Sequence, residues 1–322
     1  MKRNRLTFDT NQKWREERAN SVGASAVGIL FGETHFLTPL ALANKMREEL
    51  NGIFSYDQTW AMKRGHAHEG SVAYLWEDAT GLSIIKASQQ EYLVRRDDIP
   101  FMHASPDRTY WIDNDGPRSD DNKGILECKN PGGFEPLAEI PASWELQLQV
   151  QMGICGYKEG YLAWEVAGCL SPDGFGYRRY EFDQEIFDAA VEVCRDFWHR
   201  CILGGEDPIP VNAADVIKLY PTSKVGKVLT ADNETLDLID QYKSYKQTEK
   251  ELKILIDGTA DKIKTLFTDE EAIVNIDGKT LATFKTAAPR TTIDSKKLKA
   301  EYPEAYAACS KEGKASRTLL VK

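Results

Sequence analysis

The sequence has no apolar run near the roughly 18 residues that a membrane-spanning helix requires. Its opening, Met1-Lys2-Arg3-Asn4-Arg5, continues into polar sequence and lacks the apolar segment of a secretory signal peptide. We therefore expect a cytoplasmic protein. The 6 cysteines are scattered without a Cys-x-x-Cys pair, which indicates reduced thiols rather than a disulfide framework or a zinc site.

The motifs of several other chemistries are missing. A His-Glu-x-x-His zinc motif beginning at His68 would need a second histidine where Val72 stands. The Pro-Cys-x-x-Cys element of zinc deaminases and a glycine-rich ATP-binding loop are both absent. The four-cysteine pattern of iron–sulfur nucleases is not evident either. We therefore expect neither zinc, ATP nor an iron–sulfur cluster from these patterns.

The formal net charge of -9 is unusual for a protein that binds nucleic acid. The acidic excess lies in residues 1–240, whereas residues 241–322 have a basic excess. Carboxylates gathered for a divalent metal would produce such an excess, and a local basic groove can bind phosphate whatever the net charge. Charge alone therefore neither establishes nor excludes a nucleic-acid substrate.

A chain of 322 residues can form one catalytic-sized domain and a smaller appendage. We place these at 1–225 and 226–322, with a surface loop or a domain boundary over 204–221. Helical spacing predicts helices at 38–50, 59–78, 142–155 and 184–202. β-Rich runs predict strands at 91–95, 109–113, 124–129, 160–168 and 176–182. This order indicates an α/β domain.

The appendage has a different pattern. A coiled-coil-like apolar stripe from Leu238 to Leu266 predicts either one long helix or a helical hairpin. Asp277-Gly278 between two β-rich runs predicts a hairpin turn, and 294–310 predicts a last helix despite Pro303. We assign no chemistry to this region.

Ser105-Pro106-Asp107 is followed, after 19 intervening residues, by Glu127-Cys128-Lys129. Residues two apart on a strand project to the same face, so Glu127 and Lys129 should point together while Cys128 enters the core. Asp107 can then lie beside Glu127. The two carboxylates suit Mg²⁺ or Mn²⁺, which prefer oxygen ligands, and Lys129 could position a water molecule or offset developing charge. The alternative is an exposed, salt-bridged strand face.

Two further elements flank this pattern. Glu69 falls beside Val72, Ala73 and Trp76 on a predicted helix, and a carboxylate at the edge of an apolar face requires a partner. Gln147 and Gln151 share one face of the helix after Pro141. Taken singly, each could equally be an ordinary polar residue on a helix surface.

The ordered set of a helical Glu, Ser-Pro-Asp, Glu-x-Lys and Trp-x-x-Gln-x-Gln resembles the phage lambda exonuclease and YqaJ-like viral recombinase family, over roughly residues 14–200. The resemblance implies a PD-(D/E)XK nuclease core, with a central mixed sheet flanked by helices and a helical and hairpin C-terminal appendage. It implies Glu69, Asp107 and Glu127 as metal-site acids, Lys129 as the catalytic lysine and Gln147 as the active-site glutamine.

A Trp-x-x-x-Arg segment ending at Arg18, followed by Ala24-Ser25, resembles the family as well. The resemblance implies that Arg18, Ser25 and Ser105 bind a terminal 5′ phosphate, although a surface arginine and an N-cap serine are the alternative. Arg108 stands where the family usually has glycine, and Asn130 where cysteine is common. Arg108 puts the local turn in doubt.

The resemblance therefore implies a Mg²⁺-dependent exonuclease, with Mn²⁺ as a substitute, that degrades duplex DNA ends from 5′ to 3′ for recombination in a bacterial or phage-infected cytoplasm. Its expected partners are a single-strand annealing protein and further copies of itself in a ring. An endonuclease or single-strand exonuclease with the same core remains an alternative. A non-catalytic DNA-binding recombination factor is another.

Overall fold

The computed structural model describes residues 2–34, 36–54, 59–85, 91–311 and 316–322. The chain forms two compact units, Met1–Val216 and Ile217–Lys322. The sequence analysis placed a division at residue 225, after the whole of helix α7 (Ala213–Leu219). Within the described residues, every helix is too short or too polar to cross a membrane.

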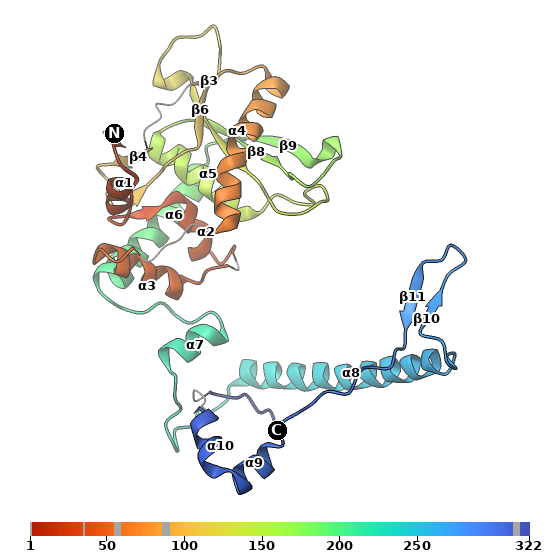
Figure 1. Cartoon of the computed structure of the whole chain (residues 1–322). Coiled ribbons are helices and arrows are strands. Elements are labelled where there is room, and N and C mark those ends of the chain that lie inside the picture. The colour runs from red at the N-terminus through yellow and green to blue at the C-terminus, as the bar shows by residue number, and fades with distance from the viewer. Residues whose placement is uncertain (1, 35, 55–58, 86–90, 312–315) are drawn as a thin grey trace. The chain divides into compact units, whose positions relative to one another are not determined.

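A five-stranded mixed sheet is the centre of the first unit (Figure 1). Only the central pair, β7 and β8, is parallel, and helix α5 (Ala142–Cys155) makes the connection that parallel strands require. This arrangement confirms the predicted mixed α/β fold. The strands, in spatial order, are β3 (Ile84–Ile85), β6 (Arg108–Trp111), β7 (Lys123–Lys129), β8 (Glu159–Glu165) and β9 (Phe175–Glu181).

Helices cover both faces of strand β7. Leu126 and Cys128 lie in a cluster with Val72 and Trp76 of helix α4 (Trp60–Thr80). Ile125 lies in the larger core on the other side, which includes residues of α5 and of α6 (Gln184–Asp196). Because side chains alternate along a strand, Glu127 and Lys129 share the α5 side with Ile125. The sheet therefore places its Glu-x-Lys pair under one helix.

The remaining elements of the first unit surround this sheet. Strand β1 pairs antiparallel with β4, and β2 pairs parallel with β5. These strands are β1 (Arg3–Phe8), β2 (Val22–Gly23), β4 (Glu91–Arg96) and β5 (Met102–His103). The helices are α1 (Asn11–Arg18), α2 (Val27–Leu30), α3 (Pro39–Leu50) and the π-helical turn η4 (Phe197–Leu203). Three short 3-10 turns are η1 (Ala24–Ala26), η2 (Asp120–Asn122) and η3 (Pro172–Gly174).

The prediction of a loop over 204–221 was wrong in part, because α7 lies within it. Asn212 Oδ1 accepts from the Asp215 amide at 2.9 Å, which stabilises the first turn of the helix. Asp215 is buried and accepts from Thr38 Oγ1 at 2.8 Å. This long-range contact holds the helix against the N-cap residue of α3.

The second unit contains one long helix, α8 (Asn233–Lys264), which decides between the two predicted alternatives (Figure 1). None of its residues is buried. The predicted hairpin is β10 (Ala272–Val274) and β11 (Thr280–Thr283), with Gly278 in the left-handed region at φ 78°. The predicted last helix is divided into α9 (Ser295–Glu301) and α10 (Pro303–Cys309), because proline lacks an amide hydrogen and is favoured at the start of a helix.

Candidate active site

The backbone of strand β7 holds Asp107 in place. Asp107 directly precedes β6, whose Arg108 pairs with Leu126 of β7. The Asp107 Oδ2 atom accepts a hydrogen bond from the Cys128 amide at 2.9 Å. The structure thus brings the carboxylates of Asp107 and Glu127 to neighbouring places on one hairpin, as their spacing predicted.

Glu127 is 3% exposed and would be costly to bury as a lone anion. Lys129 Nζ donates to its Oε1 atom at 2.8 Å, and Gln147 Nε2 donates to the same atom. Gln151 Nε2 donates to Oε2 at 2.8 Å. Lys129 Nζ also donates to Gln147 Oε1 at 2.8 Å, so one cation and two amides from α5 surround the carboxylate.

Glu69 approaches from α4, the helix on the other face of the sheet. Its Oε1 atom lies 2.8 Å from His66 Nδ1, and its Oε2 atom lies 3.9 Å from Arg108 Nη1. Arg108, the residue that stands where the family usually has glycine, therefore begins a regular strand and extends its side chain toward Glu69. No described residue other than glycine has a positive φ, so Arg108 needs no left-handed turn.

The charges of the three acids act on one another. Burial raises the pKa of Asp107 well above its usual value, and the negative charges of Glu127 and Glu69 raise it further, while Lys129 opposes this. As they stand in the described residues, no three His, Cys, Asp or Glu side chains are close enough to hold a metal ion. The three predicted ligands are nevertheless all carboxylates whose negative charges repel one another, and a hard divalent cation would neutralise that repulsion.

A small pocket of about 30 Å³ lies beside these residues. It is lined by all three predicted phosphate ligands, Arg18, Ser25 and Ser105, together with Gln147. Its other lining residues are Gly23, Ala24, His103 and Gln151. Since Gln147 and Gln151 also bond to Glu127, the pocket and the carboxylate site share two side chains.

The three predicted phosphate ligands are held in different ways. Arg18 ends α1, and its guanidinium lies 4.4 Å from the centre of the Trp14 ring. Ser25 is exposed in the 3-10 turn η1. Ser105 Oγ donates to the Tyr92 carbonyl at 3.0 Å, so the hydroxyl in this position offers the pocket an acceptor.

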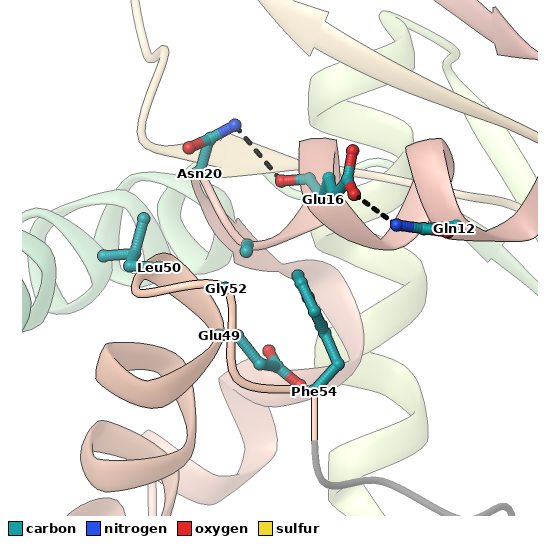
Figure 2. A pocket seen from close by; sticks show the side chains of 8 residues that line it. Gln12, Glu16, Asn20, Glu49, Leu50, Gly52 and Phe54 are labelled. Carbon is teal, nitrogen blue, oxygen red and sulfur yellow. Dashed lines mark hydrogen bonds between the residues drawn. The ribbon is translucent and has the colours of Figure 1, made fainter.

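A larger pocket of about 260 Å³ lies elsewhere, between α1 and the turn after α3 (Figure 2). The carboxylates of Glu16 and Glu49 line it, and Gln12 Nε2 donates to Glu16 Oε1 at 2.9 Å. None of the residues that line it is basic, and none is a predicted site residue. Its electrostatics are therefore unsuited to a phosphate group.

Comparison with known families identifies the region that contains this site. Residues 13–158 match the YqaJ-like viral recombinase domain. The matched range lies within the first unit of this chain. All eight predicted site residues fall inside the matched range, and the resemblance inferred from the sequence is confirmed.

One relative is similar over nearly the whole chain. The uncharacterised protein YqaJ of Bacillus subtilis (strain 168) is 26% identical over 316 residues, which cover 94% of this chain and 92% of the relative. The similarity thus extends beyond the matched range into the second unit.

Two solved structures are similar at lower identity. An alkaline exonuclease from Laribacter hongkongensis is 18% identical, with a TM-score of 0.48 over 60% of this chain and 94% of that one. A phage-related exonuclease from Haemophilus somnus 129PT is 13% identical, with a TM-score of 0.40 over 58% of this chain and 96% of that one.

Two residues at this candidate site were not assigned by the sequence analysis. Gln151 was placed on the face of Gln147 but given no contact with Glu127. His103 was not considered, although it stands two residues before Ser105, the spacing at which side chains of an extended segment share a face. That spacing was the available signal.

Proposed function

We propose that the chain is a metal-dependent deoxyribonuclease that removes nucleotides from duplex DNA ends, from 5′ to 3′, and leaves single strands for recombination. The observation that carries this proposal is the contact of Glu127 with Lys129 and Gln147 next to Asp107, within a YqaJ-like domain. The order of these groups along the chain is the one that the sequence analysis described, and their contacts support the proposal.

In this proposal Asp107 and Glu127, with Glu69, hold Mg²⁺, or Mn²⁺ in its place. When bound, the metal supplies a water of lowered pKa and neutralises charge on the phosphate under attack. Lys129 has its ammonium 2.8 Å from both Glu127 Oε1 and Gln147 Oε1, so its position is fixed without further side-chain ordering. From there it orients the attacking water and stabilises charge that develops in the transition state. Gln147 holds the Lys129 ammonium and the Glu127 carboxylate in register.

The pocket lined by Arg18, Ser25 and Ser105 would hold the terminal 5′ phosphate. An arginine fork binds phosphate oxygens through charge-assisted hydrogen bonds. Because Gln147 lines the same pocket and contacts Glu127, a phosphate bound there would fix the register of the strand relative to the carboxylates. This geometry favours an exonuclease over an endonuclease.

The partners follow from the same proposal. The substrate is a duplex DNA end, the product strand passes to a single-strand annealing protein, and copies of the chain form a ring around DNA in the cytoplasm of a bacterium or phage-infected host. A single-strand exonuclease with this core would act on linear single strands in the assay below, and a non-catalytic recombination factor would cleave none of the substrates.

The deciding experiment compares end-labelled linear duplex, covalently closed circular duplex and linear single strands. We expect release of nucleotides from the linear duplex with Mg²⁺ or Mn²⁺, no cleavage in EDTA and little with Ca²⁺. A Glu127→Gln protein is the matched inactive control. Cleavage of the circle would support the endonuclease alternative, and undiminished cleavage in EDTA would refute the metal assignment.

A further inference from the structure

His103 is buried at 2% exposure in strand β5, within the pocket that contains Arg18. Its Nδ1 atom lies 2.9 Å from Ser21 Oγ. Its Nε2 atom is also buried and has no hydrogen-bond partner among the described residues. A buried polar atom without a partner is costly, which points to a group that is supplied from outside the chain.

The Ser21 hydroxyl is placed to donate to His103 Nδ1. Arg95 Nη2 donates to Ser21 Oγ at 3.0 Å, and an arginine can only donate. Arg95 occupies one acceptor site of Ser21 Oγ, and the hydroxyl hydrogen can point to His103 Nδ1. In that arrangement the imidazole hydrogen lies on Nε2 and the atom without a partner is a donor, which the ¹⁵N spectra below test directly.

The imidazole is held in its neutral form. Burial lowers the pKa of His103 well below its ordinary value, and the positive charges of Arg18 and Arg95 lower it further. His103 thus adds a directional N–H group to the pocket without adding another full charge beside the two arginines.

Gly23 leaves open the space between this donor and Arg18. A Cβ atom at Gly23 would lie 3.0 Å from His103 Nε2 and 3.6 Å from Arg18 Nη2. Both donor groups therefore border the same small volume, which only glycine leaves unfilled. A neutral N–H donor and a guanidinium on one volume are suited to an anionic oxygen.

Gln151 adds a hydrogen-bond acceptor to the same pocket, which an anionic oxygen alone would not satisfy. Its Nε2 atom is fixed by the Glu127 carboxylate, so its Oε1 atom is an acceptor, and this atom is also buried without a partner among the described residues. An acceptor in the pocket needs a hydrogen, from a monoprotonated phosphate or from a water molecule. A pocket of about 30 Å³ has room for a water, so a purely structural water is the competing occupant.

We propose that His103 is a specificity-determining residue for the DNA end, which donates from Nε2 to an oxygen of the terminal 5′ phosphate that Arg18 binds. This inference rests on the proposed function and adds a residue to its phosphate pocket. The neutral donor gives the pocket a direction, since its fixed tautomer cannot accept a hydrogen bond at Nε2 from a 5′ hydroxyl.

The test uses the full chain and the ratio of its Kd values for otherwise identical duplexes with 5′-hydroxyl and 5′-phosphate ends, in Ca²⁺ to suppress cleavage. We expect the wild-type protein to prefer the phosphate end. His103→Leu should reduce that preference roughly ten- to a hundredfold, the effect of losing a hydrogen bond to a charged group. His103→Gln, which keeps an N–H donor, should retain most of it. His199→Gln, at an exposed histidine that does not line the pocket, is the matched control.

A second measurement guards against a His103 variant that fails to fold. The chain has 5 histidines, so ¹⁵N-histidine spectra of the wild-type protein are simple to assign. We expect His103 to carry its hydrogen on Nε2, and its Nε2 signal to shift with a 5′-phosphorylated duplex but not with a 5′-hydroxyl duplex.

An unchanged Nε2 signal with both duplexes, or an unchanged phosphate preference in a folded His103→Leu protein, would overturn the proposal and leave a structural water as the occupant. The proposed function fails separately. Wild-type protein that releases no nucleotides with Mg²⁺, while His103→Leu still loses the preference for phosphate ends, would contradict the nuclease and support the role of His103.

Discussion

Replacing Lys129 with methionine should separate the metal site from the chemistry. Lys129 Nζ lies 2.8 Å from Glu127 Oε1, and the two side chains are only 17% and 3% exposed. Removing the lysine leaves a buried carboxylate with two amide donors, Gln147 and Gln151. Breaking such a buried pair costs about 3–5 kcal/mol. At about 2–4 °C per kcal/mol for a domain of this size, the Tm in EDTA should fall by about 6–20 °C.

Mg²⁺ should reverse most of this loss. A cation bound by Asp107 and Glu127 replaces the positive charge that the lysine supplied, so the rise in Tm on adding Mg²⁺ should be larger for Lys129→Met than for the wild-type protein. Cleavage should nevertheless fall by roughly 10²-fold or more, because the group that orients water and offsets developing charge is gone. Stronger metal stabilisation would then accompany weaker catalysis.

Thermal melts in EDTA and in Mg²⁺, calorimetric Mn²⁺ titration and single-turnover cleavage check this together. Glu127→Gln is the matched control: it removes an anionic ligand, so the Mg²⁺-induced rise in Tm and cleavage should both fall, while DNA binding survives in either variant. A Lys129→Met protein that cleaves at the parental rate would reduce the Glu-x-Lys match to an ordinary salt-bridged strand. A Mg²⁺ response no larger than that of the wild type would refute the role of Lys129 as counter-cation.

Three further predictions follow from the same geometry. The raised pKa of Asp107 means that its contribution to the stability of the metal-free fold is present at low pH and is lost as pH rises through that pKa. Asp107→Asn should therefore raise the urea midpoint in EDTA by an amount that is small at low pH and grows as the pH rises toward the raised pKa, and a difference that does not change with pH would count against the charge repulsion. Arg18→Ala should weaken binding to 5′-phosphate ends more than to 5′-hydroxyl ends, whereas equal losses would remove its role as anchor. Ending the chain after Val228 should preserve Mn²⁺ binding but alter assembly, processivity or DNA affinity, and no change in these three properties would make the second unit a passive appendage.

The local elements at the site were predictable because their patterns are short in range. The bounds predicted for the helix at 142–155 match α5, and the alternation of Glu127, Cys128 and Lys129 on β7 follows from strand geometry. The neighbouring positions of Asp107 and Glu127 also followed from one hairpin. Each of these predictions needed only the periodicity of a single segment or a single turn.

The features that the sequence analysis did not predict depend on contacts between segments far apart in the chain. Strand β1 is polar and alternates between exposed and half-buried residues, so it becomes a strand by pairing with β4, more than eighty residues away. The proposed donor role of His103 depends on Ser21 and Arg95, which the fold brings to His103 from separate segments of the chain. No periodicity within one segment contains that information. The ligand roles of Glu69, Arg18 and Ser25 remain predictions, because they depend on a bound metal ion or phosphate and not on contacts within the chain.

Helix α5 connects the proposed phosphate pocket to the buried carboxylate of Glu127. Its Gln147 and Gln151 are one turn apart, and both donate to Glu127 while lining the pocket of Arg18 and His103. A ligand that moved either amide would therefore also change the hydrogen bonds of the buried carboxylate. Because Glu127 is almost fully buried, such a change alters the electrostatics of Asp107 as well, whose pKa responds to the Glu127 charge. Binding of a DNA end and binding of a cation are thus expected to be coupled, and linkage requires that the coupling be equal in both directions. The Kd for a 5′-phosphate end, measured with and without Ca²⁺, should therefore change by the same factor as the Kd for Ca²⁺ measured with and without that end.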